Sequence, residues 1–476
     1  MRSTLVFSVV LLLVGHAFVR ADDAEQYNEI RQLLSSGKLE EAEKAFTLAI
    51  EAAPDSARLK TLYSHFYFYL NRAGRTQDAA RYAEANVEMW LDNLARSPQM
   101  APNIWRQVDS VTTAYVRLGQ HELAVQKLDE IVDKVEALLA AKESAEVTAL
   151  LVELRARKAL LLASAGRTDA GRELLQSIQE RAEAAVAMNG SDTSAILTLA
   201  TVLSIRAQLE AGGEAGEAAS KEHLNYLATQ AQTHPASQAI VSAYLAAKTL
   251  ALSHLVRSDA ALAGTELATL REFLASLDKE NQQIQNLIKT SERGLSSLES
   301  RIAAAKAQQA LIGQSSFPLE AEAWVNGDDL TDKELEGKVV LIDFWAVWCG
   351  PCIATFPHLR EWQDKYSDKG LVIIGATRYY SYDWDDATNR IKKVENLSTE
   401  DERAAMSRFA QYHELKHRFM VMPKDSRFSK KYGVTGIPQA VLIGRDGKVQ
   451  MIRVGSGEAN AHDLEAKIEE LLAVSN

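Results

Sequence analysis

The sequence predicts a multidomain protein in which an all-α region of helical hairpins precedes an α/β domain. Residues 24–312 are rich in alanine, leucine, glutamate and arginine at helical spacing and contain few prolines. After residue 318 the pattern changes to short apolar runs, which are typical of buried strands, separated by helical and turn segments. A chain of 476 residues is also too long for one ordinary domain.

Composition narrows the class of protein further. The chain is 47% hydrophobic and 25% charged, as expected for a globular protein and not for an extensively disordered one. A net charge of -11 argues against nucleic acid or an anionic membrane as a partner. With only two cysteines, the protein is not a small scaffold held together by disulfides.

The N-terminus resembles an export signal. Arg2 precedes an apolar run over Leu5–Val14, and Val19–Ala21 offers small residues of the kind that a signal peptidase recognises. Because the run is too short to cross a bilayer comfortably, it predicts a signal peptide over residues 1–21, with no transmembrane segment in the mature chain. An uncleaved anchor is the alternative. We therefore expect an exported protein, periplasmic or otherwise extracytoplasmic, where a disulfide can persist.

A recurring turn organises residues 22–310. Each copy starts with Gly or Ser and carries a small residue five positions later, and successive copies lie roughly 37 to 47 residues apart. Gly can end one helix in a left-handed conformation, and the small residue lets the next helix approach closely. The pattern therefore predicts stacked helical hairpins. The copies are Gly37–Ala42, Gly74–Ala79, Gly119–Ala124, Gly166–Gly171, Gly213–Ala218 and Ser258–Ala263.

The first of these units resembles a tetratricopeptide repeat. Gly37, Ala42, Phe46, Ala49 and Pro54 stand at that family's spacing. Later units keep the turn but lose the aromatic residue and the proline. The region is therefore predicted to be tetratricopeptide-like, with an irregular helical bundle as the alternative.

The C-terminal third is predicted to form a mixed α/β sheet, with parallel strands joined by a crossover helix and then an antiparallel hairpin. The expected elements are a long amphipathic helix containing Ile284 and Ile302, a linker over Gly313–Pro318, a buried central strand over Val339–Trp345, a helix over Cys352–Tyr366, a second buried strand over Leu371–Ala376, a hairpin of Gln439–Ile443 with Lys448–Val454, and a closing helix over Ala459–Val474.

The two cysteines lie where the central strand should meet the following helix. Two intervening residues, Gly350 and Pro351, place Cys349 and Cys352 close enough to form a disulfide, and Pro is well suited to a first helical turn. The helix N-terminus lowers the pKa of a thiol. We therefore expect Cys349 to be an exposed nucleophile and Cys352 to be the resolving thiol.

Two other uses of the cysteines are less favoured. A zinc site would need His413 and His417, which lie about 60 residues further along the chain in a segment that resembles a charged surface helix. A purely structural disulfide closing so short a loop would add little stability. The sequence therefore predicts a redox pair and no metal.

The segments Val339–Cys352 ("VVLIDFWAVWCGPC") and Tyr432–Val449 ("YGVTGIPQAVLIGRDGKV") together resemble the thioredoxin fold. More narrowly, they resemble the extracytoplasmic TlpA/ResA-like thiol-disulfide oxidoreductases. The resemblance implies a thioredoxin-like domain over residues 311–476 with thiol-disulfide oxidoreductase activity and no cofactor. It also implies that Trp348 shields the disulfide and that Pro438 is a cis-proline facing the pair. A cis bond there would leave the backbone of Ile437 free to bind a substrate strand.

Asp343 is predicted to complete the catalytic group. It lies six residues before Cys349 in an otherwise apolar strand, where burial would raise its pKa and suit it to accept the proton of Cys352. It matches the buried acid of thioredoxins. The alternative is a carboxyl group that reaches solvent or caps a neighbour.

Two positions depart from the family's patterns. Thr355 stands where many relatives tied to cytochrome c maturation have an acid, so that role is in doubt, and residues 371–376 lack the lysine that thioredoxins place near the buried acid. An insertion over residues 378–423 carries Tyr379, Tyr380, Tyr382 and Trp384. These aromatic residues could contact substrate, but packing of an inserted helical lobe is favoured.

Together these features predict an exported enzyme that reduces or exchanges the disulfides of protein substrates. The expected partners are a disulfide-containing protein substrate, an upstream thiol reductant and a protein bound by the helical repeats. The alternative is an interaction protein that works through its repeats, with the thioredoxin-like domain as a docking module.

Overall fold

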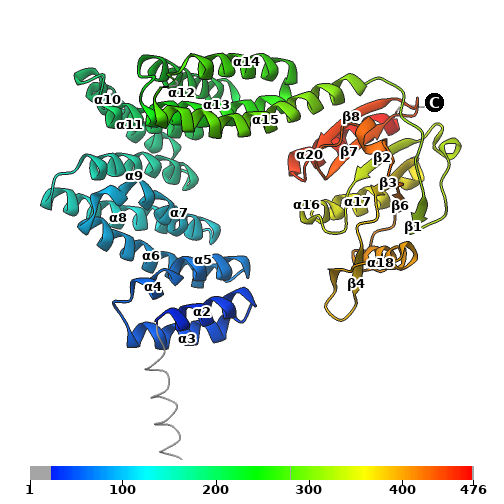
Figure 1. Ribbon diagram of the computed structural model, residues 1–476, viewed down its shortest axis with the longest axis horizontal. Coiled ribbons are helices and arrows are strands. Elements are labelled where there is room, and N and C mark those ends of the chain that lie inside the picture. The colour runs from blue at the N-terminus through cyan, green and yellow to red at the C-terminus, as the bar shows by residue number, and fades with distance from the viewer. Residues whose placement is uncertain (1–22, 279, 474–476) are drawn as a thin grey trace, which may run out of the picture. The chain divides into compact units, whose positions relative to one another are not determined.

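The computed structural model describes residues 23–278 and 280–473 (Figure 1). The predicted signal peptide, residues 1–21, lies outside the described residues. The chain divides into two compact units, one reaching Ala247 and including Asp278–Gln285, and the other containing Lys248–Leu277 and everything from Asn286 onward. The boundary predicted between residues 310 and 311 falls inside the second unit and stays a prediction.

The first unit is built from helices joined by short turns, coloured blue to green in Figure 1. Its helices are α2 (Asp23–Ser35), α3 (Leu39–Ala52), α4 (Ala57–Lys60), α5 (Leu62–Arg72), α6 (Thr76–Arg96), α7 (Ala101–Arg117), α8 (His121–Ala141), α9 (Ala145–Ser164), α10 (Thr168–Met188), α11 (Thr193–Leu209) and α12 (Gly213–Thr233). Neighbours along the chain pack against one another, and buried alanine, leucine and valine side chains fill the spaces between them.

Glycine ends several of these helices in the left-handed conformation, as the recurring turn predicts. Gly37, Gly74, Gly119 and Gly166 have φ values of 79, 78, 71 and 79°, and each following helix begins two residues later. The small residues five positions on are buried at the helix contacts. At Gly171 an added Cβ would lie 2.6 Å from the carbonyl oxygen of Ala159. The arrangement is one of helical hairpins, while the tetratricopeptide-like assignment stays a prediction.

The fifth turn was predicted in the wrong frame. Ala218 is exposed, and the buried small residue at the helix contact is instead Gly216, where an added Cβ would collide with the carbonyl oxygen of Glu210. Helix α12 begins immediately after Gly212, whose φ is 101°. The buried small residue is thus two positions earlier than predicted. The position that must stay small is the one where the two helix backbones approach most closely, and its distance from Gly213 does not determine it.

Three further helices follow: α13 (Gln238–Ser258), α14 (Ala260–Ser276) and α15 (Gln282–Leu311). Within the described residues, α13 is the helix whose length and composition would allow it to cross a membrane. Its 18-residue apolar stretch has a mean hydropathy of 1.5, and 33% of that stretch is buried in the protein. Helix α15 continues through the exposed Gly294, which therefore does not interrupt the long helix that the sequence predicts.

The second unit contains a six-stranded mixed sheet with the order β1-β6-β3-β2-β7-β8. Parallel pairing joins β2 to β3 and β3 to β6, whereas β1, β7 and β8 pair antiparallel to their neighbours. The predicted mixed α/β sheet is confirmed. Its strands are β1 (Ala323–Val325), β2 (Val339–Phe344), β3 (Leu371–Thr377), β6 (Arg418–Val421), β7 (Gln439–Ile443) and β8 (Val449–Val454).

Strand β2 is buried along its whole length. Leu341 and Trp345 point into the core on one face of the sheet, and Ile342 and Phe344 point into the core on the other. Because side chains alternate along a strand, a strand covered on both faces needs a continuous apolar run, and this is why the run predicted a central strand.

The helix predicted over residues 352–366 is divided in two just before Pro357, the position at which the thioredoxin resemblance implies a kink. Helix α16 (Gly350–Ile353) ends at Ile353, and α17 (Phe356–Tyr366) begins three residues later with Pro357 in its first turn. Proline lacks the N–H that an uninterrupted helix would use, so it favours a new helix start. Leu359 and Trp362 of α17 pack on the sheet face that also receives α20 (Glu458–Ala473).

Residues 313–318, predicted to be a linker, are hydrogen-bonded to the edge of the main sheet. The Gly313 N–H donates to the carbonyl oxygen of Val449 at 2.8 Å, and the Val449 N–H donates to that of Gln314 at 2.9 Å. Ser315 forms an antiparallel bridge with Lys448. The segment is held because the outer edge of β8 would otherwise present unpaired backbone groups.

The predicted insertion over residues 378–423 is a β-hairpin and a helix, rather than a wholly helical lobe, and its last residues belong to the main sheet as β6. The hairpin pairs β4 (Tyr382–Asp385) with β5 (Arg390–Lys393), and α18 (Thr399–Tyr412) follows. Trp384 is buried, with its ring edge-on to Phe409 at a centroid distance of 5.7 Å. Packing of this aromatic residue, the favoured expectation, is confirmed.

Gly375 of β3 offers a test of how tightly the sheet is packed. A Cβ added there would lie 2.7 Å from Nε1 of Trp345 and 3.0 Å from Cδ1 of Phe419. Gly375→Ala should therefore lower the free energy of unfolding by about 1–3 kcal/mol, measured by denaturant titration. Gly294→Ala, in the exposed part of α15 with open space around it, should instead raise that free energy by up to about 1 kcal/mol. Equal effects of the two substitutions would contradict the packing described.

Candidate active site

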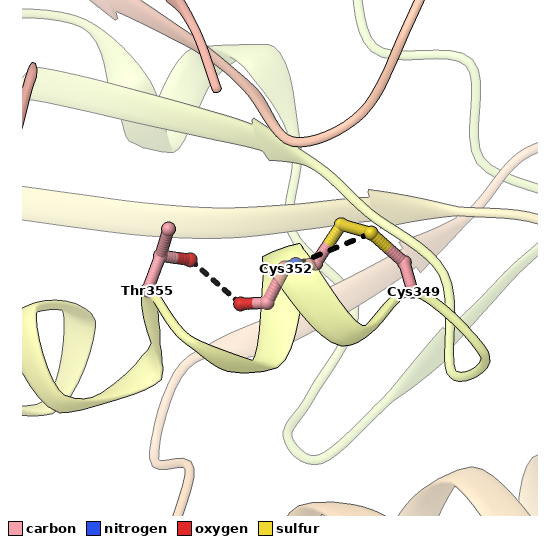
Figure 2. Close-up of a disulfide and its surroundings, with 3 residues drawn as sticks. All are labelled: Cys349, Cys352 and Thr355. Atoms are coloured by element: carbon pink, nitrogen blue, oxygen red, sulfur yellow. Dashed lines mark hydrogen bonds between the residues drawn. A yellow bond between two sulfur atoms is a disulfide. The ribbon is translucent and has the colours of Figure 1, made fainter. Parts of the chain in front are cut away.

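The cysteine pair lies at the junction between β2 and α16 (Figure 2). Cys349 and Cys352 form a disulfide with an S–S distance of 2.03 Å and a Cα–Cα distance of 5.2 Å. Cys349 caps the N-terminus of α16, and its Sγ accepts a hydrogen bond from the N–H of Cys352 at 3.2 Å. The first sulfur thus occupies the position in which helix N–H groups stabilise negative charge.

Both cysteines are more enclosed than expected. Cys349, predicted to be an exposed nucleophile, is only 4% exposed, and Cys352 is completely buried. The prediction of an exposed Cys349 is wrong for this disulfide form, because both cysteines belong to the core cluster against which Ile353 and Ile437 also pack. Cys349 is nevertheless the more accessible of the two.

The surface beside the disulfide is formed by Trp348 and the first turn of α16. Trp348 is 46% exposed and meets the ring of Tyr380 edge-on, with centroids 5.5 Å apart. Gly350 and Pro351 are exposed, and open space surrounds the Cβ position of Gly350. A substrate backbone could therefore approach the pair at this turn.

The loop before β7 lies against the same cluster. The Ile437–Pro438 peptide bond is cis, and Ile437 is half-buried against the core that contains both cysteines. Strand β7 begins at Gln439, so Ile437 lies just outside the sheet ladder. The position of Ile437 is compatible with the predicted substrate-binding role, which stays a prediction.

Asp343 is buried at the centre of the sheet. It pairs in register with Gly375 of β3 and Ala440 of β7 and is 3% exposed. Burial raises the pKa of Asp343 to about 7, from an ordinary 3.8, and Oδ2 has no hydrogen-bond partner among the described residues. The alternative of a carboxyl group that reaches solvent does not fit this environment.

A cavity of about 30 Å³ adjoins Asp343. Thr355, His358, Pro438 and Arg453 are among the residues that line it, and the volume is sufficient for a water molecule. The hydroxyl group of Thr355 donates to the carbonyl oxygen of Cys352 at 2.8 Å (Figure 2). Thr355 therefore links the turn that carries Cys352 to the cavity beside Asp343.

The two histidines considered as zinc ligands are used in packing. Burial lowers the pKa of His417 to about 4, and its ring lies edge-on to Phe419. His413 packs against Phe409 and Phe356. Within residues 23–278 and 280–473, no group of three or more histidine, cysteine, aspartate or glutamate side chains is arranged to hold a metal ion.

Glu402, a buried carboxylate on α18, was not predicted to belong to the site. Its oxygens accept the backbone N–H groups of Tyr380, Ser381 and Tyr382 at 2.6, 3.0 and 3.3 Å. Ser381 has a φ of 62°, so this turn is held in a conformation that non-glycine residues adopt infrequently. Glu402 thereby positions Tyr380 against Trp348. Its partners are backbone groups, which any sequence offers, so no residue pattern could have identified it.

The C-terminal third of the chain is similar to known proteins. Residues 313–469 match the Redoxin family. Over 147 residues the chain is 28% identical to the thiol-disulfide oxidoreductase ResA of Bacillus thuringiensis subsp. konkukian, covering 31% of this chain and 71% of that protein. It is 32% identical over 141 residues to the protein DipZ of Mycobacterium tuberculosis, covering 29% of this chain and 18% of DipZ. A solved structure of a thiol:disulfide interchange protein DsbE from Chlorobium tepidum is 29% identical, with a TM-score of 0.25, and the match covers 33% of this chain and 93% of that one.

Asp343 should make stability fall as pH rises. Between about pH 4 and pH 7 the folded protein keeps a proton on Asp343 that the unfolded chain has lost. The contribution of this group to the free energy of unfolding is therefore fully present below about pH 4 and is lost as the pH rises through about 7. Asp343→Asn removes this titration. The gain in free energy of unfolding on substitution should be larger at pH 8 than at pH 5 by about 2–3 kcal/mol.

Denaturant titrations of the two oxidised proteins at both pH values measure this difference. The same gain at pH 5 and pH 8 would show that the carboxyl group of Asp343 titrates normally in the folded protein.

Proposed function

We propose that this chain, whose C-terminal third is a Redoxin domain of the ResA-like thiol-disulfide oxidoreductases, is an exported enzyme that reduces or exchanges disulfides in protein substrates. The observation that carries the proposal is the Cys349–Cys352 disulfide at the start of α16, in one cluster with Ile437, at the end of the strand that buries Asp343. The Redoxin match and the ResA relatives support thiol-disulfide oxidoreductase activity in this domain.

The first step is attack by the Cys349 thiolate on a substrate disulfide. A mixed disulfide forms between Cys349 and one substrate sulfur, and the other substrate sulfur leaves as a thiolate. The N–H of Cys352, which donates to Cys349 Sγ in the disulfide form, can stabilise the Cys349 thiolate in the reduced form. Ile437, outside the sheet ladder, is available to pair with the substrate backbone.

The second step releases the substrate. Cys352 gives its proton to the Asp343 carboxylate and attacks Sγ of Cys349, so the second substrate sulfur leaves and the Cys349–Cys352 disulfide forms. The substrate disulfide gains two electrons and the cysteine pair loses two. An external thiol reductant must then return two electrons to the pair. The cavity beside Asp343 can hold the water that carries the proton onward.

Export, partner recruitment and the direction of electron transfer each have support in the chain. The apolar run over residues 5–14 supports export, and the helical hairpins offer surfaces for recruiting a protein partner. The Trp348–Cys352 sequence, Trp-Cys-Gly-Pro-Cys, favours a reducing role like that of thioredoxin.

Cysteine substitutions should separate the two chemical steps. With dithiothreitol as reductant, the full-length protein should accelerate reduction of insulin disulfides, and Cys349→Ser should lower the rate to that of the buffer alone because the nucleophile is gone. Cys352→Ser should instead accumulate a mixed disulfide through Cys349, visible on non-reducing gels. Unchanged insulin reduction by Cys349→Ser would overturn the proposed function and favour an interaction protein.

Asp343→Asn should slow the second step more than the first. Loss of the proton acceptor should reduce the rate of mixed-disulfide resolution by about 10- to 100-fold, while formation of the mixed disulfide changes less. The wild-type resolution rate should rise as pH increases through about 7, where Asp343 becomes a carboxylate, and this rise should be absent from the variant. Stopped-flow tryptophan fluorescence resolves the two phases. A pH profile shared by both proteins would assign the proton transfer to another group.

A further inference from the structure

A groove of about 530 Å³ lies in the second compact unit, at the ends of β2 and β3 where Phe344 and Ala376 line it. One wall is helix α15, through Ser300 and Ala304, and the opposite wall includes Ile437 of the loop before β7. Tyr380, which contacts Trp348 edge-on, lines it as well. The groove therefore adjoins the surface at which a substrate must meet Cys349.

Helix α15 is attached directly to the loop that carries Ile437 and Pro438. Nε2 of Gln308 donates to the carbonyl oxygen of Gly433 at 2.8 Å and to Oε1 of Gln439 at 3.0 Å. Gln439 is wholly buried, and its own Nε2 donates to the carbonyl oxygen of Tyr432 at 2.9 Å. These bonds hold the wall of the groove in a fixed place relative to the loop.

The helix and the loop also approach closely. A Cβ added at Gly433, whose φ is 62°, would lie 3.1 Å from Cγ of Gln308 and 3.6 Å from the carbonyl oxygen of Ala304. A side chain at position 433 would push against the helix. Both sides of the contact belong to one compact unit, so the groove is a feature of that unit alone.

The lining combines apolar and cationic groups. Phe344, Ala376 and Met422 contribute apolar surface, and Arg378 and Lys430 contribute positive charge. Arg378 donates to the carbonyl oxygen of Ser426 at 3.1 Å, and within the described part of the chain neither cation is paired with a carboxylate. Lys431, next in sequence, is paired with Glu320 at 2.7 Å. Arg378 and Lys430 therefore give the groove two cations without a carboxylate partner, although the chain as a whole has a net charge of -11.

We propose that this groove binds a segment of the substrate polypeptide that carries an acidic side chain near its reactive cysteine, and that α15 is a specificity-determining wall of the site. A carboxylate placed between Arg378 and Lys430 would form charge-assisted hydrogen bonds, while apolar neighbours in the segment cover the floor. The proposal rests on the proposed function, because only a thiol-disulfide exchange reaction brings such a segment beside Cys349.

Matched peptide substrates test the charge preference. Three quenched fluorescent peptides, each with one disulfide and either Glu, Gln or Lys three residues from the cysteine, are reduced by the full-length protein with dithiothreitol. We expect kcat/KM for the Glu peptide to exceed that for the Lys peptide by about 3- to 10-fold. Arg378→Gln combined with Lys430→Gln should remove this ratio, whereas Lys424→Gln, an exposed lysine outside the groove, should keep it.

A second pair of variants tests the wall formed by α15. Ala304→Glu adds a negative charge inside the groove and should reverse the preference toward the Lys peptide, while Ala303→Glu, on the exposed side of the same helix, should leave it unchanged. Ser300→Glu provides a second position inside the groove if Ala304→Glu does not fold.

The outcomes distinguish this inference from the proposed function. Equal kcat/KM for the three peptides with an active wild-type protein would overturn the groove proposal alone. If neither Ala304→Glu nor Ser300→Glu reverses the preference between the Glu and Lys peptides, α15 is not part of the site. Failure of the wild-type protein to reduce any of the peptides or insulin would instead overturn the proposed function.

Discussion

Strand β2 is covered on both faces of the sheet, and the geometry of the site depends on that constraint. Alternate side chains must enter opposite cores, so Leu341, Asp343 and Trp345 share one face while Ile342 and Phe344 share the other. Asp343 is thereby forced into the face that also receives the cysteines and α17. A carboxyl group in that position loses its hydration, and its raised pKa follows from burial alone. Strand β2 ends at Phe344, and after four intervening residues Cys349 caps α16.

The sequence was a good guide wherever a residue's role follows from its local chemistry. A continuous apolar run identified β2, and the spacing of two cysteines identified the disulfide. The β7–β8 hairpin was identified by its two strand segments and by Asp446 and Gly447 between them, a favoured hairpin turn. Asp343 could be singled out because an acid in an apolar strand is costly and therefore informative. These features depend on a few neighbouring residues, so one sequence is sufficient to find them.

Features that depend on distant backbone groups were missed or misjudged. Glu402 binds the N–H groups of a turn about 20 residues earlier, and Gln308 binds the loop near residue 433. The segment over residues 313–318 pairs with the edge of β8, more than 130 residues away, although its composition resembles a free linker. Cys349 is enclosed by side chains from several elements, which local spacing cannot reveal. In each case the partner is defined only once the sheet has assembled.

In the proposed mechanism, Cys349 and Cys352 transfer two electrons to a substrate disulfide and end as the observed disulfide. A single-turnover experiment tests this claim most directly. Fully reduced wild-type protein is mixed with one equivalent of a disulfide-bonded peptide without added reductant, and the products are identified by mass spectrometry. The account predicts one equivalent of reduced peptide and a protein that has lost two hydrogen atoms, with the bond mapped to Cys349–Cys352. Recovery of the reduced protein and an intact peptide disulfide would contradict it.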